Sequence, residues 1–235
     1  MLKKLNELAV GSIIIMGKIE LDNKMFACQQ NLLHLNKLQK AVLVFICQQS
    51  NSLYNSALYE VRQRYFKSSK AIIDDEGVVK RRGGHLVGYS FLCQTLKSNK
   101  NYKSIFAQAA QQTLKGLVES LKSYKALLKK FFKSGLNFYP SLPKYPSSGG
   151  LYTVSYPKQA LKLINGQIRI PLGKQIKAWF RLSEIHLPFP SNLDFTTIRE
   201  LRILPRNGCL YAEYVYNTGA KQIELNPDAS VTSDQ

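Results

Sequence analysis

Catalytic residue types occur in this sequence, but their spacing matches no common catalytic site. Two-metal nucleases need several carboxylates that a sheet and its helices bring together around divalent cations. The densest acidic group, Asp74-Asp75-Glu76, lies in a charged stretch typical of a solvated turn. The three histidines are far apart, without a Cys or Ser partner in a known signature: His34, His85 and His186. We therefore predict no catalytic residue and interpret the chain as a binder.

Metal and cofactor sites have little support in the sequence. The four cysteines are scattered singly, with no Cys-x-x-Cys pair and no histidine at ligand spacing: Cys28, Cys47, Cys93 and Cys209. They are expected to be reduced structural thiols, and His186, on an expected strand, is interpreted as a structural histidine. Glycine-rich signatures that hold nucleotide phosphates are absent. No metal and no cofactor are predicted.

The charge balance favours a polyanionic partner. The chain has 33 Lys and Arg against 15 Asp and Glu, a formal charge of +18 and a pI near 9.8. Residues 1–150 hold 23 of the basic and 8 of the acidic residues, so +15 of the +18 lies there. Such a field attracts nucleic acid or an anionic membrane. Nucleic acid is favoured, because no basic amphipathic segment carries the apolar insertion face that membranes require.

A long helix is predicted from about Ser104 onward, and it carries the clearest basic pattern. Its apolar seam steps by four and three residues through Ala110, Leu114, Leu117, Leu121, Tyr124, Leu128 and Phe131. Lys115, Lys122 and Lys129 repeat every seven residues and lie in one row, with Lys125, Lys130 and Lys133 nearby, so the exposed side carries a basic strip about 30 Å long at 1.5 Å per residue. Glu119 is its only acid, so phosphate contact is favoured over an ordinary solvated surface.

The rest of the first half is also expected to be mainly helical. Residues 29–66 have a helical period, and Ser50-Asn51-Ser52 either divides this segment into two helices or merely makes one helix polar. Residues 89–96 predict a short helix, and residues 13–21 predict a strand. Residues 67–88 are expected to form a loop. Its Arg81-Arg82 tip either closes over a phosphate backbone or is simply solvated.

Residues 149–217 are predicted to form a small β domain. Asn165-Gly166 and Asn207-Gly208 each join two short runs, as expected for two-residue hairpin turns. Between the hairpins, residues 176–182 alternate between apolar and polar and predict another strand. Arginines interleave with aromatics along these strands, which would give an electropositive sheet face. Residues 135–150, rich in Pro, Ser and Gly, are expected to be a stiff linker.

The N-terminal sequence bears on localisation, and the C-terminal sequence bears on order. The short apolar run before Lys18 is too brief for a signal peptide or a spanning helix, so a cytoplasmic protein without a membrane partner is expected. Residues 218–235 are polar, and we expect a disordered linker there.

The order of these parts resembles the TnpB family, the RNA-guided endonucleases of bacterial insertion sequences that are similar to compact type V CRISPR effectors. Three blocks carry the resemblance: residues 48–59, with the Tyr54-Asn55 pair; residues 108–115 followed by Phe131-Phe132-Lys133; and residues 148–216, with Ile170-Pro171-Leu172 and Tyr211-Ala-Glu-Tyr-Val-Tyr216. The resemblance covers about residues 21–217.

The resemblance implies an α+β fold in which a small antiparallel, oligonucleotide-binding-like β-barrel, the wedge, is interrupted by a helical recognition lobe. The implied division is residues 11–28 for the first part of the wedge, 29–135 for the helical lobe, 136–217 for the rest of the wedge and 218–235 for a linker. Guide RNA and double-stranded DNA are the implied partners. The family's RNase H-like nuclease, catalytic acids and zinc ribbon are absent from this sequence, so we expect a non-catalytic N-terminal half. The alternative is one piece of a split nuclease or transposase, completed by a separately encoded RNase H-like chain.

Carried over to this sequence, the resemblance implies that Tyr54-Asn55 and a Gln face read the flanking DNA. Glutamine can pair with adenine in a bidentate manner, although a merely wet polar face is an equal alternative. Together with the basic residues, the predicted nucleic-acid-binding set is Tyr54, Asn55, Arg81, Arg82, Gln108, Gln111, Gln112, Lys115, Lys122, Lys125, Lys129, Lys133, Arg202 and Arg206.

Overall fold

The structure, a computed structural model, describes residues 24–73, 79–82, 84–133 and 135–221. The helices are α2 (Lys37–Ser68), α3 (Tyr89–Leu96), α4 (Lys100–Ser104), α5 (Ala107–Phe132), α6 (Lys174–Phe180) and the short 3-10 turns η1 (Lys158–Ala160) and η2 (Phe195–Thr197). The strands are β1 (Lys24–Leu32), β2 (Lys70–Ile73), β3 (Val79–Arg82), β4 (Val154–Pro157), β5 (Lys162–Ile164), β6 (Gln167–Pro171), β7 (Glu184–Pro188), β8 (Ile198–Arg206) and β9 (Cys209–Lys221). The strand predicted over residues 13–21 lies outside the described residues.

The described chain is α+β with antiparallel sheets, as predicted. The larger sheet has the order β1-β9-β8-β4, and a second sheet has the order β5-β6-β7. β1 precedes all the helices of residues 37–132, whereas its partner β9 follows them. The helical block is therefore an insertion between two strands that pair with each other. β1 continues to Leu32, so the prediction of helix from residue 29 was wrong, and helix starts at Lys37.

Both Asn-Gly hairpins are confirmed. Asn165 and Gly166 have φ of 48° and 71°, and Asn207 and Gly208 have φ of 50° and 73°. Two successive left-handed residues give the turn whose twist matches paired antiparallel strands, and Asn and Gly adopt that conformation at the lowest cost. These turns fix the registers of β5 with β6 and of β8 with β9.

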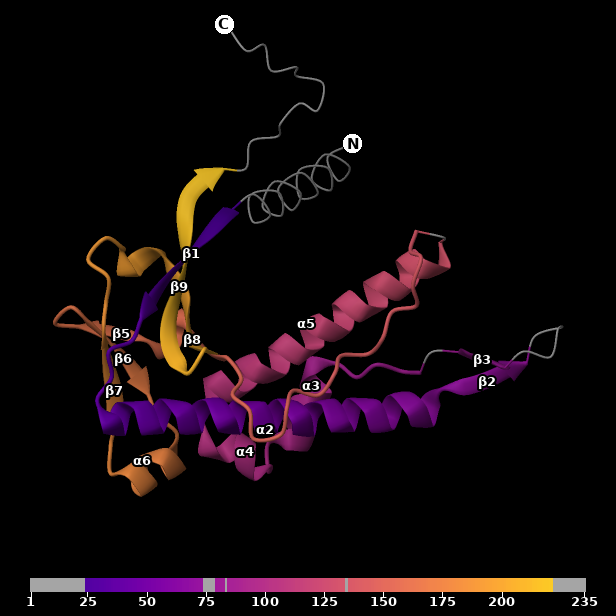
Figure 1. Ribbon diagram of the computed structural model, residues 1–235, viewed down its shortest axis with the longest axis horizontal. Coiled ribbons are helices and arrows are strands. Elements are labelled where there is room, and N and C mark those ends of the chain that lie inside the picture. Colours follow the sequence, from indigo (N-terminus) through magenta and orange to yellow (C-terminus); the bar gives the residue numbers. More distant parts are fainter. Residues whose placement is uncertain (1–23, 74–78, 83, 134, 222–235) are drawn as a thin grey trace, which may run out of the picture.

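α2 is a single helix of 32 residues, and the other helices and the sheets lie along it (Figure 1). Asn36 begins it with a capping box, in which its side chain accepts from the backbone N–H of Gln39 and the Gln39 side chain accepts from the N–H of Asn36. The sheets lie at the N-terminal end of α2, and the β2–β3 hairpin extends from its other end (Figure 1). Among the described residues, no helix combines the length and apolar character needed to span a membrane.

The Ser50-Asn51-Ser52 segment does not break α2, because its polar side chains have partners inside the fold. Ser50 and Asn51 are 0% and 1% exposed. The Ser50 hydroxyl lies 2.9 Å from that of Thr113 on α5 and donates to the carbonyl oxygen of Thr153 at 3.3 Å. Asn51 Nδ2 donates to the carbonyl of Ser147 at 2.9 Å. One polar turn of α2 thus joins the long helix α5 and the segment that leads into β4.

Residues 135–150, predicted as a stiff linker, run back along α2 and are held there by its side chains. Asn55 Nδ2 donates to the carbonyl of Pro146 at 3.2 Å, and an Arg62 guanidinium N–H donates to that of Pro143 at 2.7 Å. Leu142, directly before Pro143, is buried in the core. We call this segment the strap. Its ordered path depends on side chains that reach its carbonyl groups, since it forms no helix or strand.

Three sequence-based predictions of local structure were wrong. Residues 176–182 form α6 and the turn after it, not a strand. Ile176 is buried and Phe180 packs against Phe45, with ring centroids 5.8 Å apart. Residues 67–88, predicted as a loop, include the end of α2 and the β2–β3 hairpin. β9 continues to Lys221, which pairs with Lys24, so the polar tail begins later than residue 218.

The Ser50–Thr113 contact gives a testable prediction. Ser50→Ala and Thr113→Val should each lower the free energy of unfolding by about 1–2 kcal/mol, because each removes the Ser50–Thr113 hydrogen bond and one further bond to a backbone carbonyl, of Thr153 or of Ala109. The double variant should lose less than the sum, because the bond between the two hydroxyls is lost in both single variants. Guanidinium unfolding measures all three values, with Ser120→Ala, which removes only a bond to its own helix, as the control. Strictly additive losses would contradict the contact.

Candidate nucleic-acid interface

α5 presents a basic face along its whole length. Its seam is buried from Ala110 to Tyr124, as predicted, and the exposed side chains include Lys115, Lys122, Lys125, Lys129, Lys130 and Lys133. The prediction of an exposed lysine row is confirmed. From residue 120 to residue 183 the sequence has twelve Lys and Arg and no Asp or Glu. Glu119, four residues from Lys115 and three from Lys122, is the one acid on α5, and Lys125, Lys129 and Lys130 have no acid three or four residues away on this helix.

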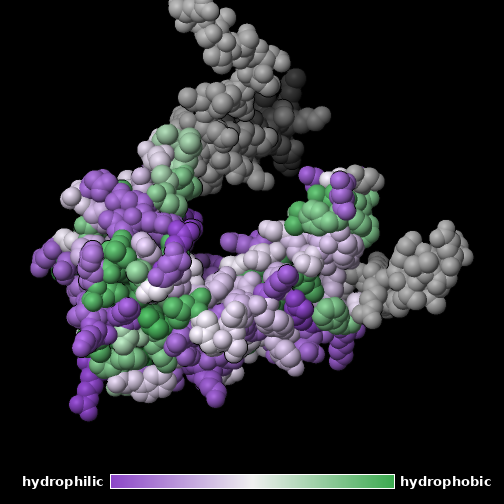
Figure 2. Space-filling model, viewed as in Figure 1, coloured by the Kyte–Doolittle hydropathy of each residue, from purple (hydrophilic) through white to green (hydrophobic). Residues whose placement is uncertain are grey.

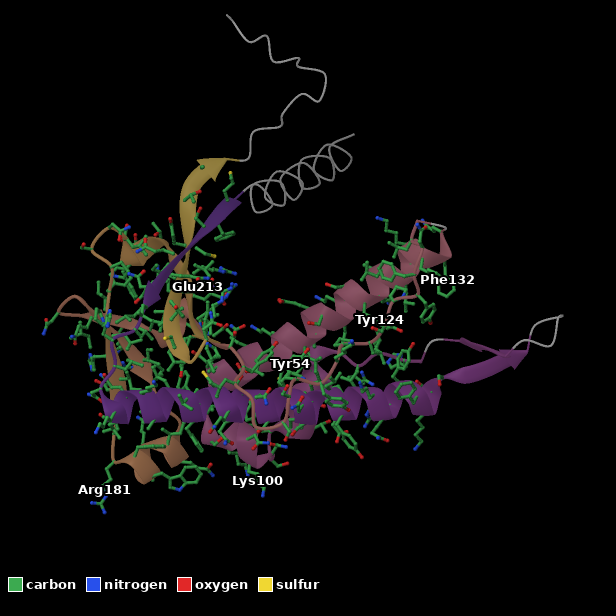
Figure 3. All side chains as sticks on the ribbon, viewed as in Figure 1. Tyr54, Lys100, Tyr124, Phe132, Arg181 and Glu213 are labelled. Atoms are coloured by element: carbon green, nitrogen blue, oxygen red, sulfur yellow. The ribbon has the colours of Figure 1, made fainter. Side chains whose placement is uncertain are left out.

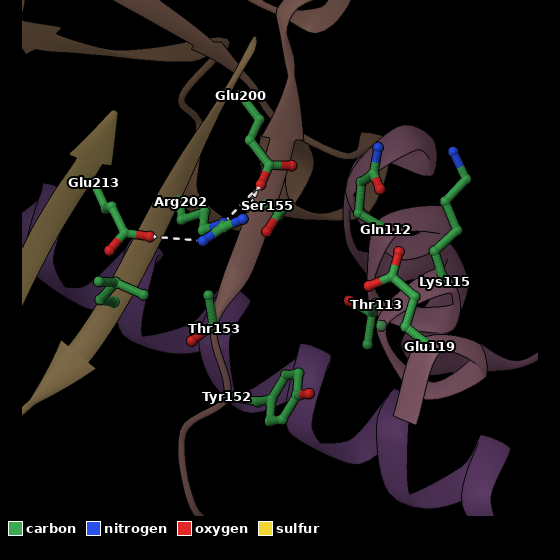
Figure 4. A pocket seen from close by; sticks show the side chains of 12 residues that line it. Gln112, Thr113, Lys115, Glu119, Tyr152, Thr153, Ser155, Glu200, Arg202 and Glu213 are labelled. Carbon is green, nitrogen blue, oxygen red and sulfur yellow. Dashed lines mark hydrogen bonds and ion pairs between the residues drawn. The ribbon is translucent and has the colours of Figure 1, made fainter. Parts of the chain in front are cut away.

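A groove lies between α5 and the four-stranded sheet (Figure 4). Its inner part has a volume of about 380 Å³, and a wider part of about 1070 Å³ continues along β8 and the ends of β1 and β9. Gln112, Lys115 and Glu119 from α5 and Glu200 from β8 line both parts. In Figure 2 the surface is hollowed between the sheet and the arm that contains α5. Lys115, the first lysine of the row, thus lies in the groove, whereas Lys122 and Lys129 lie beyond it on α5.

Arg202 lies in this groove, but carboxylates occupy its guanidinium. Its Nε donates to Glu200 Oε1 at 2.6 Å and its Nη1 to Glu213 Oε2 at 2.9 Å. Glu213, 7% exposed, also accepts from Gln30 Nε2 on β1 at 2.7 Å. Burial lowers the pKa of Arg202 and the two carboxylates raise it, with a net upward shift, so the charge is retained. Arg202 thus neutralises two acids and ties β8 to β9, and its contact with nucleic acid stays a prediction.

Tyr54 and Asn55, predicted to read DNA, are structural in this fold. Tyr54 is 5% exposed and its ring lies against that of Tyr152, with centroids 4.7 Å apart. Asn55 is half-buried and its Nδ2 holds the strap at Pro146. Both side chains have contacts inside the fold, and their reading of DNA stays a prediction.

The predicted glutamines separate into different environments. Gln112 lines both parts of the groove beside Lys115. Gln108 is half-buried, and its Oε1 is buried without a hydrogen-bond partner among the described residues. Gln111 is half-buried on the same helix. Of the three, Gln112 is the one that the structure brings together with the basic row.

The remaining predicted arginines lie elsewhere. Arg206 adjoins the β8–β9 turn and lines a small hollow with Val44 and Leu151, outside the groove between α5 and the sheet. Arg81 and Arg82 belong to β3, in the hairpin beyond the end of α2 (Figure 1). The structure therefore does not gather Arg206, Arg81 and Arg82 into one site with Lys115.

Two basic residues outside the predicted set lie in the wider groove, Lys158 on η1 and Arg199 on β8. Lys158 Nζ donates to the carbonyl of Thr196 and lies 5.7 Å from the Phe195 ring centroid. Arg199 is exposed. The sequence signal for Lys158 was the long stretch without acids, and that for Arg199 was its place among the arginines of the β stretch. Both place basic side chains on the far wall of the wider groove, whose lining also includes Glu119 and Glu200.

Two of the side chains that could catalyse reactions have clear surroundings in the fold. His186 Nε2 lies 2.8 Å from Glu184 Oε1, and this hydrogen bond, followed by the charge of Arg169, lowers the pKa of Glu184. Burial raises the pKa of the Cys47 thiol to about 12, so it stays protonated. Four other His and Cys side chains are exposed and lie apart from one another in the sequence: His34, His85, Cys28 and Cys209. The described residues contain no group of three or more His, Cys, Asp or Glu side chains placed to hold a metal ion.

Comparison of the chain with protein-family models gives no match, and comparison with curated proteins gives no significant one. The function is therefore inferred from the site itself.

The engagement of Arg202 leads to a prediction that separates structure from binding. Arg202→Ala should lower the free energy of unfolding by about 1–2 kcal/mol, because the largely buried Glu213 loses its charged partner while solvent at the 38% exposed Arg202 side chain offsets part of the loss. Affinity of the folded variant for RNA should change less than about twofold. The control, Arg199→Ala on the same strand, should weaken RNA binding with little change in stability. Weaker RNA binding by Arg202→Ala, together with unchanged RNA binding by Arg199→Ala, would contradict this assignment.

Proposed function

We propose that this chain binds nucleic acid through the lysine row of α5 and the groove where that row begins. The supporting observation is the exposure of Lys115, Lys122 and Lys129 along one helix, next to a stretch of 64 residues without an acid, from 120 to 183. Lys and Arg that neutralise phosphates release condensed counterions, and this release drives sequence-independent binding.

The spacing of the lysine row fits a phosphate backbone. Lysines seven residues apart on a helix are about 10.5 Å apart along its axis, at 1.5 Å per residue. Phosphates of one strand of B-DNA advance by about 3.4 Å per nucleotide, so this spacing is about three nucleotides. Lys115, Lys122 and Lys129 are therefore about three nucleotides apart as measured along the axis of a duplex that lies beside α5. Gln112 in the groove has an amide that suits a base edge at the start of this path.

The role that fits these features best is that of a TnpB-like N-terminal half that holds guide RNA and flanking double-stranded DNA and is non-catalytic by itself. Support comes from the strand order, because β1 and β9 pair across an inserted helical block, as expected for a wedge domain interrupted by a recognition lobe. In this proposal the two antiparallel sheets correspond to the wedge-like barrel, and the protein acts in the cytoplasm.

The second candidate is a piece of a split RNA-guided endonuclease or transposase, completed by a separately encoded RNase H-like chain. The observation that favours it is the exposed apolar side chains of β1, where Met25 is 45% and Phe26 is 52% exposed. Apolar side chains exposed close together often mark a protein interface. Co-expression with an RNase H-like chain from the same locus, followed by a DNA-cleavage assay, distinguishes a complete nuclease from a binder.

Charge reversal tests the proposed function. Lys115→Glu/Lys122→Glu/Lys129→Glu should weaken binding to a 30-nucleotide RNA and reduce the slope of log affinity against log salt by about three units, one for each lost phosphate contact. All three side chains are exposed, so the fold should remain intact. Fluorescence anisotropy over 50–300 mM salt measures the slope.

The matched control is Lys97→Glu/Lys100→Glu/Lys103→Glu. These lysines are also exposed, at α3–α4, and Lys100 lies on the other side of α2 from α5 in Figure 3. This variant has the same net charge as the α5 variant but keeps the α5 row. If both variants weaken RNA binding equally, binding depends on the total charge of the protein and not on the α5 row. If the α5 variant binds RNA as the wild type does, the proposed interface is refuted.

A further inference from the structure

The free end of α5 carries a cluster of exposed aromatic rings. Phe132 is 73% exposed, the highest value among the large apolar side chains of the described residues. Phe138 and Tyr139 at the start of the strap are 59% and 56% exposed. In Figure 3 Phe132 lies at the end of the arm, far from the sheet, and Figure 2 shows apolar and hydrophilic surface side by side there. We call Phe131, Phe132, Phe138 and Tyr139 the aromatic tip.

Two rings of the tip are held in place by a third. Phe131, half-buried on the seam of α5, contacts Phe132 at a centroid distance of 5.6 Å and Tyr139 at 5.3 Å. The interplanar angles are 72° and 82°, so both outer rings stand edge to face against it. The backbone N–H of Gly135 donates to the carbonyl of Lys130 at 3.0 Å and turns the strap back at this point. Phe132 and Tyr139 therefore have support in the fold and remain exposed to a ligand.

The charge around the tip selects the class of ligand. Lys125, Lys129, Lys130 and Lys133 are exposed on the last two turns of α5, and the sequence has no acid between residues 120 and 183. An exposed apolar patch within such a field suits a ligand that is both anionic and rich in flat unsaturated rings. Unpaired nucleotides have both properties, because each base offers a π face and each phosphate a negative charge. Paired bases in a duplex do not expose these faces.

We infer that the aromatic tip binds unpaired nucleotides by stacking, where the strand that runs along the lysine row leaves its duplex. This inference rests on the proposed nucleic-acid binding and adds the structural state of the ligand. Exposed lysines continue beyond the lysine row to the tip. From Lys115 in the groove to Lys133 at the end of α5 they extend over about 27 Å, at 1.5 Å per residue. A duplex region lies along the row, and its single-stranded extension reaches Phe132 and Phe138.

The test compares two RNAs that share one 12-base-pair duplex, one blunt and one with a 3′ extension of six uridines. The wild-type chain should bind the extended RNA more tightly. Phe132→Ala and Phe138→Ala should each weaken binding to the extended RNA about fivefold or more, since stacking on one base contributes at least that much. Affinity for the blunt duplex should not change. Phe132→Tyr should restore the preference, because it keeps the aromatic face.

A matched control and a second readout keep the test decisive. Tyr59→Ala removes an aromatic ring of similar exposure, 54%, from α2 and should leave both affinities unchanged. With 5-iodouridine in the extension, ultraviolet cross-linking followed by trypsin digestion should mark the peptides that hold Phe132 or residues 134–144.

The possible failures are distinguishable. If the wild type binds neither RNA, the proposed function itself fails. If it binds both RNAs equally and Phe132→Ala changes neither affinity, nucleic-acid binding stands and the stacking site is refuted. If Phe132→Ala instead converts a dimer to a monomer in sedimentation, a second copy of the chain covers the tip, and this too overturns the inference.

Discussion

The structure depends on one polar turn in the middle of α2. Around Cys47, Ser50 and Asn51 the helix makes hydrogen bonds to three other parts of the chain. The Ser50 hydroxyl contacts α5, Asn51 holds the strap, and the backbone N–H of Tyr152 donates to the carbonyl of Cys47 at 3.1 Å. A buried polar group without partners is costly, so this turn is compatible with burial only in the observed arrangement. These contacts join α5, the strap and the entry to β4 to the same helix.

The groove and the lysine row follow from that constraint. At this turn α2 contacts both α5 and the segment that leads into β4. These contacts set the distance between α5 and the four-stranded sheet, and therefore the width of the groove. Lys115 and Gln112 lie at this wall of the groove, only one or two residues from the Thr113 contact. The sheet side is held by its own network, in which Arg202 joins Glu200 and Glu213. Binding side chains and structural side chains thus alternate within a few residues.

The sequence predicted a structural element correctly where the residues of that element determine its conformation by themselves. Asn165-Gly166 and Asn207-Gly208 specify their turns by their own backbone preferences, and both hairpins were predicted correctly. The seam of α5 extends over many turns, so its period was unambiguous and its exposed lysines followed from it. In the seven residues of α6, by contrast, Ile176 and Phe180 satisfy a period of two and a helical step of four equally well. Only the packing on Phe45 decides between them.

The sequence could not show which predicted site residues the fold itself uses, because a deciding partner is distant in sequence. The backbone carbonyl that engages Asn55 belongs to Pro146, 91 positions later, and Glu213 reaches Arg202 from the neighbouring strand. The resemblance implied binding at Asn55 and the charge suggested it at Arg202, whereas their neighbours in space show that both also have a structural role. The exposed lysines gave no such error, because a side chain on the outer face of a helix has few distant partners that could engage it.

Lysine acetylation of the full chain, with and without a saturating 30-nucleotide RNA, tests the proposed interface most directly. Mass spectrometry then reports the reactivity of each lysine. If RNA lies along α5, Lys115, Lys122 and Lys129 become protected while Lys97, Lys100 and Lys103 react as in the free protein. Equal reactivity of both groups in the presence of bound RNA would contradict the interface and show that the RNA binds elsewhere.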